Sequence, residues 1–264
     1  MKKIIIYICL SVVLGGCSIY RSYKRPDVAV VDSLYRRQIS PADSAASIAD
    51  LSWKELFTDP QLQKLIERGL RNNSDLGIAR LRVKEAEALL KSARLSYLPS
   101  INLSPQGTIS KAEYGKTTKT YDLAASASWE IDIFGKLTNA KREARAVLEQ
   151  SEAYRQAVQT QLIATIANNY YTLLMLDEQL NISRRTAENW NENLRVMKAL
   201  KRAGQATDMA VAQTEAGKLS VDASLLSLER QITELENTLS SLLGSVPGDI
   251  TRSTLSGQSF SDTL

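Results

Sequence analysis

Glu130 and Asp132 are the carboxylates whose spacing invites an acid–base interpretation, because they flank Ile131 and share one face of an extended strand. No second group for proton transfer accompanies them. The 264-residue chain has no histidine and only two cysteines, which excludes a Ser-His-Asp triad, a Cys-His pair and most zinc sites. It also lacks a glycine-rich phosphate loop. We therefore expect no enzymatic activity and no metal site, and interpret the two carboxylates as charges that face water.

Cys17 is a candidate for covalent modification. Two lysines precede an apolar run, Ile4–Leu14, which is too short to span a bilayer and has the layout of a secretory signal. The run ends in Leu-Gly-Gly-Cys, which resembles the lipobox of bacterial lipoproteins. This resemblance implies cleavage before Cys17, a diacylglyceryl thioether and an N-acyl group, and several acyl chains together anchor a protein stably. Ser18 is compatible with sorting to the outer membrane. The alternative is a buried cysteine beside an ordinary cleavage site.

The net charge of +4 is spread along the chain rather than gathered in blocks. Basic and acidic residues alternate at helical spacing, as in Lys84, Glu85, Glu87 and Lys91. This pattern is typical of a solvated helix face and argues against binding of nucleic acid.

One long helix is predicted over residues 136–202, a stretch without proline or glycine. At a rise of roughly 1.5 Å per residue it would be close to 100 Å long, so it must pack against partners of similar length. Apolar or small residues recur at steps of three and four, as in the seam of a coiled coil: Leu162, Ile166, Leu173, Leu176, Leu180, Ala187, Trp190, Leu194 and Met197. Upstream, the same seam is expected to pass through Ala140, Ala144, Val147, Tyr154 and Val158.

Two further helices share this spacing. A helix is predicted over residues 60–99, with Asp59 as N-cap, Pro60 at its first position and Pro99 as its stop. Only Gly69 and Asn72 interrupt its seam. A return helix is predicted over residues 208–243, after a turn over 203–207 in which Gly204 can adopt the left-handed conformation.

Between the first two helices the apolar period changes from about 3.6 to 2, which predicts a β-hairpin within residues 100–135. One face is apolar and the other is polar or small, so that Ser126, Ser128 and Glu130 would face water. Tyr121 and Trp129 lie near opposite ends of the apolar face, as interfacial aromatics of membrane strands do. Each strand reaches the roughly 9–11 residues that a tilted crossing needs. The alternative is a soluble hairpin packed on the helices.

Several segments together resemble TolC-like outer-membrane efflux proteins, in the lipoprotein branch that serves resistance-nodulation-division pumps. The most specific is Trp129-Glu-Ile-Asp-Ile-Phe-Gly-Lys136 between strand and helix, and the resemblance covers essentially the whole mature chain. The others are 14–17, 53–60, Asn73 with Asp75, Leu76 and Ala79, 98–99, 203–207 and 242–244.

The resemblance implies a mainly α fold with a β-hairpin: long coiled-coil helices that form part of an α-barrel, and two strands of a trimeric transmembrane β-barrel. The family's protomer has two tandem repeats, of which this chain contains one. Three chains would supply six strands, fewer than the roughly 8 of the smallest membrane barrels. We therefore expect half of a longer protein or a truncated product. The expected segments are a signal peptide (1–16), a lipidated strap (17–59), a long helix (60–99), a transmembrane hairpin (100–135), a long helix (136–202), a periplasmic tip turn (203–207), a return helix (208–243) and a linker to the missing repeat (244–264).

The function implied is that of a passive exit duct in a tripartite efflux or export system, placed in the outer membrane with its helices in the periplasm. Its partners would be two further copies in a homotrimer, outer-membrane lipid, a periplasmic adaptor and an inner-membrane pump, and it would need no cofactor besides the lipid on Cys17. The expected adaptor-docking residues are Arg202, Ala203, Gly204, Gln205, Ala206 and Thr207. The alternatives are a periplasmic adaptor lipoprotein with an α-hairpin, which should show lipoyl-like halves, and a lipid-anchored hydrolase.

Overall fold

The computed structural model describes residues 52–111, 113–114 and 116–258. The predicted signal peptide, Cys17 and the strap up to residue 51 lie outside the described residues. The described chain divides into two compact units, one made of residues 88–146 and the other of residues 52–87 and 147–258. Both α4 (Ser74–Leu95) and α5 (Lys136–Arg202) contribute residues to both units.

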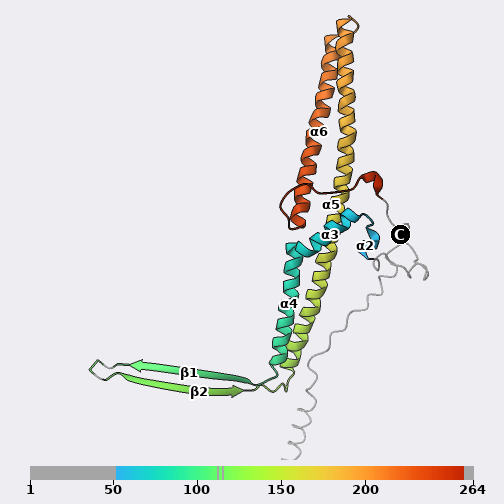
Figure 1. The fold of residues 1–264 in the computed structure, drawn as a ribbon. Coiled ribbons are helices and arrows are strands. Elements are labelled where there is room, and N and C mark those ends of the chain that lie inside the picture. The colour runs from blue at the N-terminus through green and yellow to red at the C-terminus, as the bar shows by residue number, and fades with distance from the viewer. Residues whose placement is uncertain (1–51, 112, 115, 259–264) are drawn as a thin grey trace, which may run out of the picture. The chain divides into compact units, whose positions relative to one another are not determined.

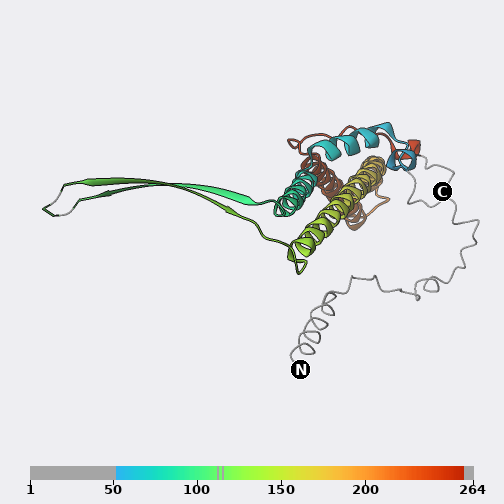
Figure 2. The same cartoon turned by 90° about the horizontal axis from the view of Figure 1, so that it is seen from below.

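The hairpin of the first unit consists of β1 (Ser100–Ser110) and β2 (Thr118–Ser128), paired antiparallel from Ser100 with Ser128 to Ser110 with Thr118. Figure 2 shows the two strands twisting about each other. Every described residue of both strands is exposed. Because side chains alternate between faces, Ile101, Leu103, Leu123 and Tyr121 share one face of the pair.

In the second unit, α5 continues to Arg202 and α6 (Asp208–Leu242) lies beside it (Figure 1). Ion pairs join the two helices, including Arg184 with Glu229 at 3.0 Å. The seam predicted over 162–197 is confirmed: its residues are buried, apart from Trp190 and Met197, which are half-buried. The 67-residue α5 covers the range predicted for the long helix.

The upstream part of that seam is confirmed only for Ala144 and Val158. The predicted residues Ala144 and Val158 are half-buried, whereas Ala140 is exposed and Val147 and Tyr154 are 38% and 49% exposed. The other half-buried residues between 144 and 158 are Leu148, Ser151 and Arg155. In this part of the helix apolar residues occur on two adjacent faces. Their spacing alone therefore does not show which face is buried. The ring of Tyr154 instead lies 5.5 Å from the guanidinium carbon of Arg82.

The single helix predicted over 60–99 is two helices, α3 (Pro60–Asn72) and α4. Asn73 separates them with an extended backbone, at φ −62° and ψ 129°. Its side-chain oxygen accepts from the Leu76 N–H at 3.0 Å, and its side-chain nitrogen donates to the Leu242 carbonyl at 3.0 Å. One asparagine therefore caps α4 and ties the break to the end of α6.

The predicted cap of α3 is confirmed, since Asp59 Oδ1 accepts from the Gln61 N–H at 2.8 Å and Pro60 begins the helix. Before it lies the short helix α2 (Trp53–Leu56), whose Ser52 and Glu55 form a capping box. Helix α2 lies within the range predicted as a strap.

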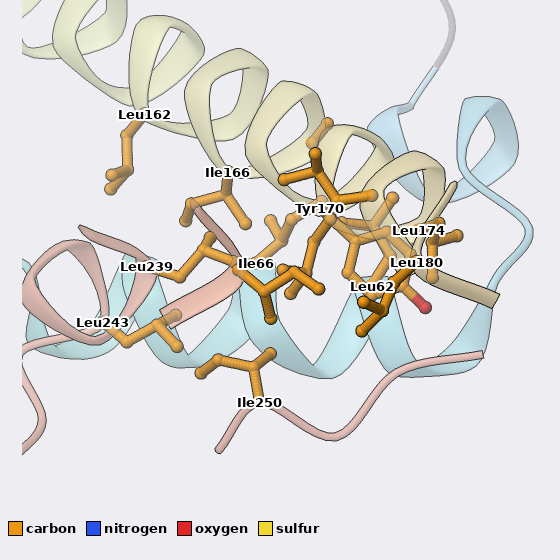
Figure 3. Packing of buried hydrophobic residues seen from close by; sticks show 14 of the residues in the cluster. Leu62, Ile66, Leu162, Ile166, Tyr170, Leu174, Leu180, Leu239, Leu243 and Ile250 are labelled. Atoms are coloured by element: carbon orange, nitrogen blue, oxygen red, sulfur yellow. The ribbon is translucent and has the colours of Figure 1, made fainter. Parts of the chain in front are cut away.

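The main core of the second unit gathers side chains from α3, α5, α6 and the segment after α6, as Figure 3 shows for Leu62, Ile66, Ile166, Tyr170, Leu239 and Ile250. Ile250 is 8% exposed, so the chain after α6, predicted as a linker, packs on the helices as far as the 3₁₀ turn η4 (Leu255–Gly257).

Candidate functional site

The two-faced β-hairpin is the first candidate site. Its apolar face is open to solvent: Ile101, Leu103, Tyr121 and Leu123 are 78%, 65%, 77% and 73% exposed. The opposite face carries mainly Ser, Asn, Gln, Thr and Asp. No described residue covers the apolar face, and a soluble monomer rarely leaves so large a patch open. The predicted alternation of faces is confirmed, and the face lacks a partner within the described chain.

The second strand ends earlier than the alternation predicts, because β2 stops at Ser128. Trp129, expected on the strand, follows it, is 64% exposed, and donates from Nε1 to the Tyr97 carbonyl at 3.1 Å. Ser126 and Ser128 remain on the polar face.

The prediction that Glu130 and Asp132 lie on the strand is wrong, because β2 ends at Ser128, although Glu130 is exposed to water as expected. Asp132 accepts hydrogen bonds from the N–H groups of Leu137 at 2.9 Å and Thr138 at 2.8 Å, so it caps α5. Glu130 pairs with Lys136 at 2.7 Å. The first N–H groups of a long helix have no partner within the helix, and they stabilise a carboxylate placed at the helix start. This interaction outweighs the alternating pattern that predicted a longer strand.

The turn between α5 and α6 is the second candidate site. Gly204 has φ +75°, its N–H donates to the Lys201 carbonyl at 3.0 Å, and the Gln205 N–H donates to the Leu200 carbonyl at 2.9 Å. These two bonds form a Schellman motif, which confirms the predicted left-handed glycine. Thr207 Oγ1 then accepts from the Ala210 N–H at 3.2 Å and caps α6. The tip residues are exposed except for the half-buried Ala206, and their part in docking stays a prediction.

A carboxylate network at the start of α3 was not anticipated beyond the cap itself. Tyr170 OH donates to Asp59 Oδ2 at 2.6 Å, Gln258 Nε2 to the same oxygen at 2.9 Å, and Ser253 Oγ to Oδ1 at 3.1 Å. Burial alone would raise the pKa of Asp59, but these hydrogen bonds and that of Gln61 together lower it below its ordinary value. Tyr170 lies four residues after Ile166 and three before Leu173, at a seam position of α5. This spacing was the only sequence feature that indicated its burial.

A second network holds the segment after α6. Arg252 pairs with Asp177 of α5 and with Glu236 of α6, and its Nη2 lies 2.8 Å from Asp177 Oδ1. The Asp177 carboxylate is the main cause of a raised Arg252 pKa, and Glu236 contributes. The partners in these ion pairs lie far apart in the chain, so the local sequence did not predict them.

Two findings bear on other classes of site. Within residues 52–111, 113–114 and 116–258, no group of three or more acidic or cysteine side chains is arranged to hold a metal ion. None of the described helices has an apolar stretch long enough to cross a bilayer.

Comparison with known proteins places residues 65–245 within the family model of outer membrane efflux proteins. The chain is 31% identical over 237 residues to a probable outer membrane lipoprotein, SilC of Salmonella typhimurium, covering 88% of this chain and 51% of that protein. It is 27% identical over 239 residues to the cation efflux system protein CusC of Escherichia coli K12, covering 90% and 52%. The chain spans about half the length of the curated relatives it matches.

The solved structures agree on the fold. The open state of the MtrE outer membrane channel of Neisseria gonorrhoeae matches with a TM-score of 0.74 and 26% identity, covering 94% of this chain and 56% of that one. The CmeC outer membrane channel of Campylobacter jejuni matches with a TM-score of 0.74 at 22% identity, which bears on the fold alone. Both of these structures are of outer membrane channels.

Proposed function

The chain belongs to the outer membrane efflux protein family, and we propose that it forms part of a passive exit duct in a tripartite efflux or export system. In this role it does no chemistry on the solute and needs no cofactor. The energy for transport comes from an inner-membrane pump. The observation that carries the proposal is the hairpin, which has one apolar and one polar face and no partner for the apolar face within the described chain.

The apolar face of the hairpin would contact outer-membrane lipid and the polar face would line water. The 11 residues of each strand are enough for a tilted crossing of roughly 9–11 residues. Two strands leave unpaired backbone groups at both edges, and in lipid those groups must be paired. The hairpin therefore needs neighbouring strands, which the other copies of a homotrimer and further strands of each protomer would supply.

The paired helices α5 and α6 would extend into the periplasm, where the turn from Arg202 to Thr207 would meet a periplasmic adaptor. An exposed turn with both helix ends capped suits such a contact, because docking there disturbs no buried side chain. The proposed diacylglyceryl and N-acyl groups on Cys17, after removal of residues 1–16, would fix the chain to the same membrane.

Substituted-cysteine labelling tests the proposal at nearby positions on the two faces of the hairpin. In isolated outer membranes, a membrane-impermeant maleimide is expected to modify Ser104→Cys and Ser126→Cys on the polar face. Leu103→Cys and Leu123→Cys, on the apolar face, are expected to resist labelling until the protein is unfolded. Leu103 and Ser104 are adjacent in β1, and Leu123 and Ser126 lie three residues apart in β2, so the members of each pair sample opposite faces at similar distances from the loop.

Equal labelling of both faces would place the hairpin in water and overturn the proposal. Fractionation and detergent cross-linking provide a second readout. We expect the chain in the outer membrane and cross-linked species up to a trimer, whereas a soluble periplasmic monomer would contradict the exit-duct function.

A further inference from the structure

The junction between hairpin and helices, residues 91–98 and 129–146, is held by specific contacts. Trp129 Nε1 donates to the Tyr97 carbonyl at 3.1 Å, and Tyr97 OH donates to Thr138 Oγ1 at 3.1 Å. Asp132 fixes the start of α5. These hydrogen bonds fix the junction rather than leaving it a loose connection.

Several large apolar side chains of the junction are exposed. Six of them are more than half exposed: Leu95 (53%), Leu98 (62%), Trp129 (64%), Ile131 (65%), Ile133 (77%) and Phe134 (88%). They flank the two strands whose apolar face we place in lipid, before β1 and after β2. Aromatic side chains such as Trp129 and Phe134 at such a position are typical of a membrane–water interface.

The charges of the junction are mainly basic. It contains Lys91, Arg94, Lys136, Lys141, Arg142 and Arg145 against Glu130, Asp132 and Glu143, six bases and three acids. Two of the acids are already engaged, Glu130 by Lys136 and Asp132 by the first N–H groups of α5. Within the part of the chain that the structure describes, no carboxylate pairs with Lys91, Arg94 or Arg142.

Lys141 lies 5.8 Å from the centre of the Tyr97 ring, so this base is held at the same surface. All four bases lie within seven residues of a helix end that adjoins the hairpin. At roughly 1.5 Å per residue they are within about 10 Å of that end, whatever the tilt of the helix. This distance is comparable with the Debye length of roughly 8–10 Å, so their charge reaches a membrane surface at the junction.

We propose that the junction binds anionic phospholipid headgroups of the periplasmic leaflet, with Lys91, Arg94, Lys141 and Arg142 as the phosphate-attracting residues beside the apolar contacts. This inference rests on the proposed membrane insertion of the hairpin. It adds a lipid preference that a purely apolar anchor lacks, because phosphatidylglycerol and a zwitterionic lipid have the same acyl chains and differ in net charge.

The test uses the full, lipid-anchored chain reconstituted into phosphatidylcholine vesicles that contain spin-labelled phosphatidylglycerol or spin-labelled phosphatidylcholine. The relative association constant of the anionic over the zwitterionic probe is the readout. We expect a ratio of about five, the effect of one fully engaged base, and its decline at high salt. The variant Lys91→Gln, Arg94→Gln, Lys141→Gln, Arg142→Gln should bring the ratio close to one.

The matched control is Lys64→Gln, Arg68→Gln, Arg71→Gln, Lys84→Gln, four exposed bases of the other unit, which should leave the ratio unchanged. Arg94→Lys with Arg142→Lys retains charge and should retain the preference.

An unchanged ratio in the junction variant, or an equal fall in the control, overturns the inference. So does a junction variant that weakens trimer cross-linking alone, since the surface would then be a subunit interface. A chain that enters the vesicles without lipid preference refutes this inference only, whereas one that enters neither kind of vesicle refutes the proposed function as well.

Discussion

The hydroxyl of Tyr170 donates a 2.6 Å hydrogen bond to the carboxylate of Asp59, which lies 111 residues earlier in the chain. Tyr170 is fully buried and Asp59 is 6% exposed. The same carboxylate caps α3 and accepts from Ser253 and Gln258. One side chain thus connects the start of α3, the middle of α5 and the segment after α6.

Replacing Tyr170 with Phe should lower the free energy of unfolding by about 2 kcal/mol, because a hydrogen bond to a charged, buried acceptor is lost. The Ser253 N–H loses its acceptor in the same substitution. Chemical denaturation in detergent, followed by circular dichroism, measures the change. Tyr154→Phe removes the hydroxyl of a half-exposed tyrosine and should change stability by less than about 0.5 kcal/mol. Equal effects of the two substitutions would contradict a special role for the Asp59 bond.

The lowered pKa of Asp59 makes stability depend on acid. A group whose folded pKa lies below its unfolded value contributes stability above that value and loses it as pH falls through the folded pKa. The contribution should therefore be complete above the ordinary value of 3.8 and disappear below it. The difference in unfolding free energy between the native chain and Asp59→Asn, measured as a function of pH, should shrink as pH falls below that value. A difference that does not vary with pH would show that the carboxylate charge is not the stabilising feature.

Arg252 should hold the segment after α6 in place. Arg252→Met leaves the carboxylates of Asp177 and Glu236 without their common partner and should cost about 2 kcal/mol or more. Arg252→Lys keeps the charge but cannot form the same forked contacts, so an intermediate loss is expected. Limited proteolysis between residues 245 and 258 should accelerate in the same order. Resistance of the Met variant equal to that of the native chain would show that the apolar contact of Ile250 suffices.

Local spacing predicted the helices and the hairpin because each element repeats one period many times. It failed at Asn73, where the seam continues in register through Leu76 although the helix breaks. The break depends on a hydrogen bond to Leu242, 169 residues away. No window of local sequence contains that partner.

The end of β2 and the segment after α6 show the same limit. Apolar and polar residues alternate beyond Ser128, yet Asp132 is drawn to the start of α5. Composition made residues 244–258 resemble a linker, because serine, threonine and glycine dominate. Their position instead depends on Ile250 and on the ion pairs of Arg252, whose partners lie on other helices.

The ring of Trp190, on α5, packs against α6 at Gly217. A Cβ at this position would come within 2.6 Å of the ring, so Gly217→Ala should destabilise the chain by about 1–3 kcal/mol even though alanine favours helix. Gly77→Ala is the matched control, because nothing lies within 4 Å of its Cβ, and it should stabilise by about 0.5–1 kcal/mol. Thermal denaturation of both variants measures the sign. Gly217→Ala combined with Trp190→Leu should recover most of the loss, and failure to recover would mean that the ring is not the obstacle.

The turn at Gly204 serves the fold and, in our proposal, the adaptor, and two substitutions separate these roles. Gly204→Ala must hold φ +75° with a Cβ, so it should cost about 1 kcal/mol of stability. Arg202→Gln changes an exposed side chain and should alter stability by less than about 0.5 kcal/mol, yet weaken adaptor binding if the tip docks. A photoreactive residue at Gln205 should then cross-link to the adaptor in cells, and less so in the Arg202→Gln background. The same residue at the exposed position of Ala223, in the middle of α6, controls for random encounter. Equal cross-linking from both positions would contradict docking at the turn, because a specific contact should be stronger at Gln205 than at Ala223. The turn would then serve only to cap the two helices.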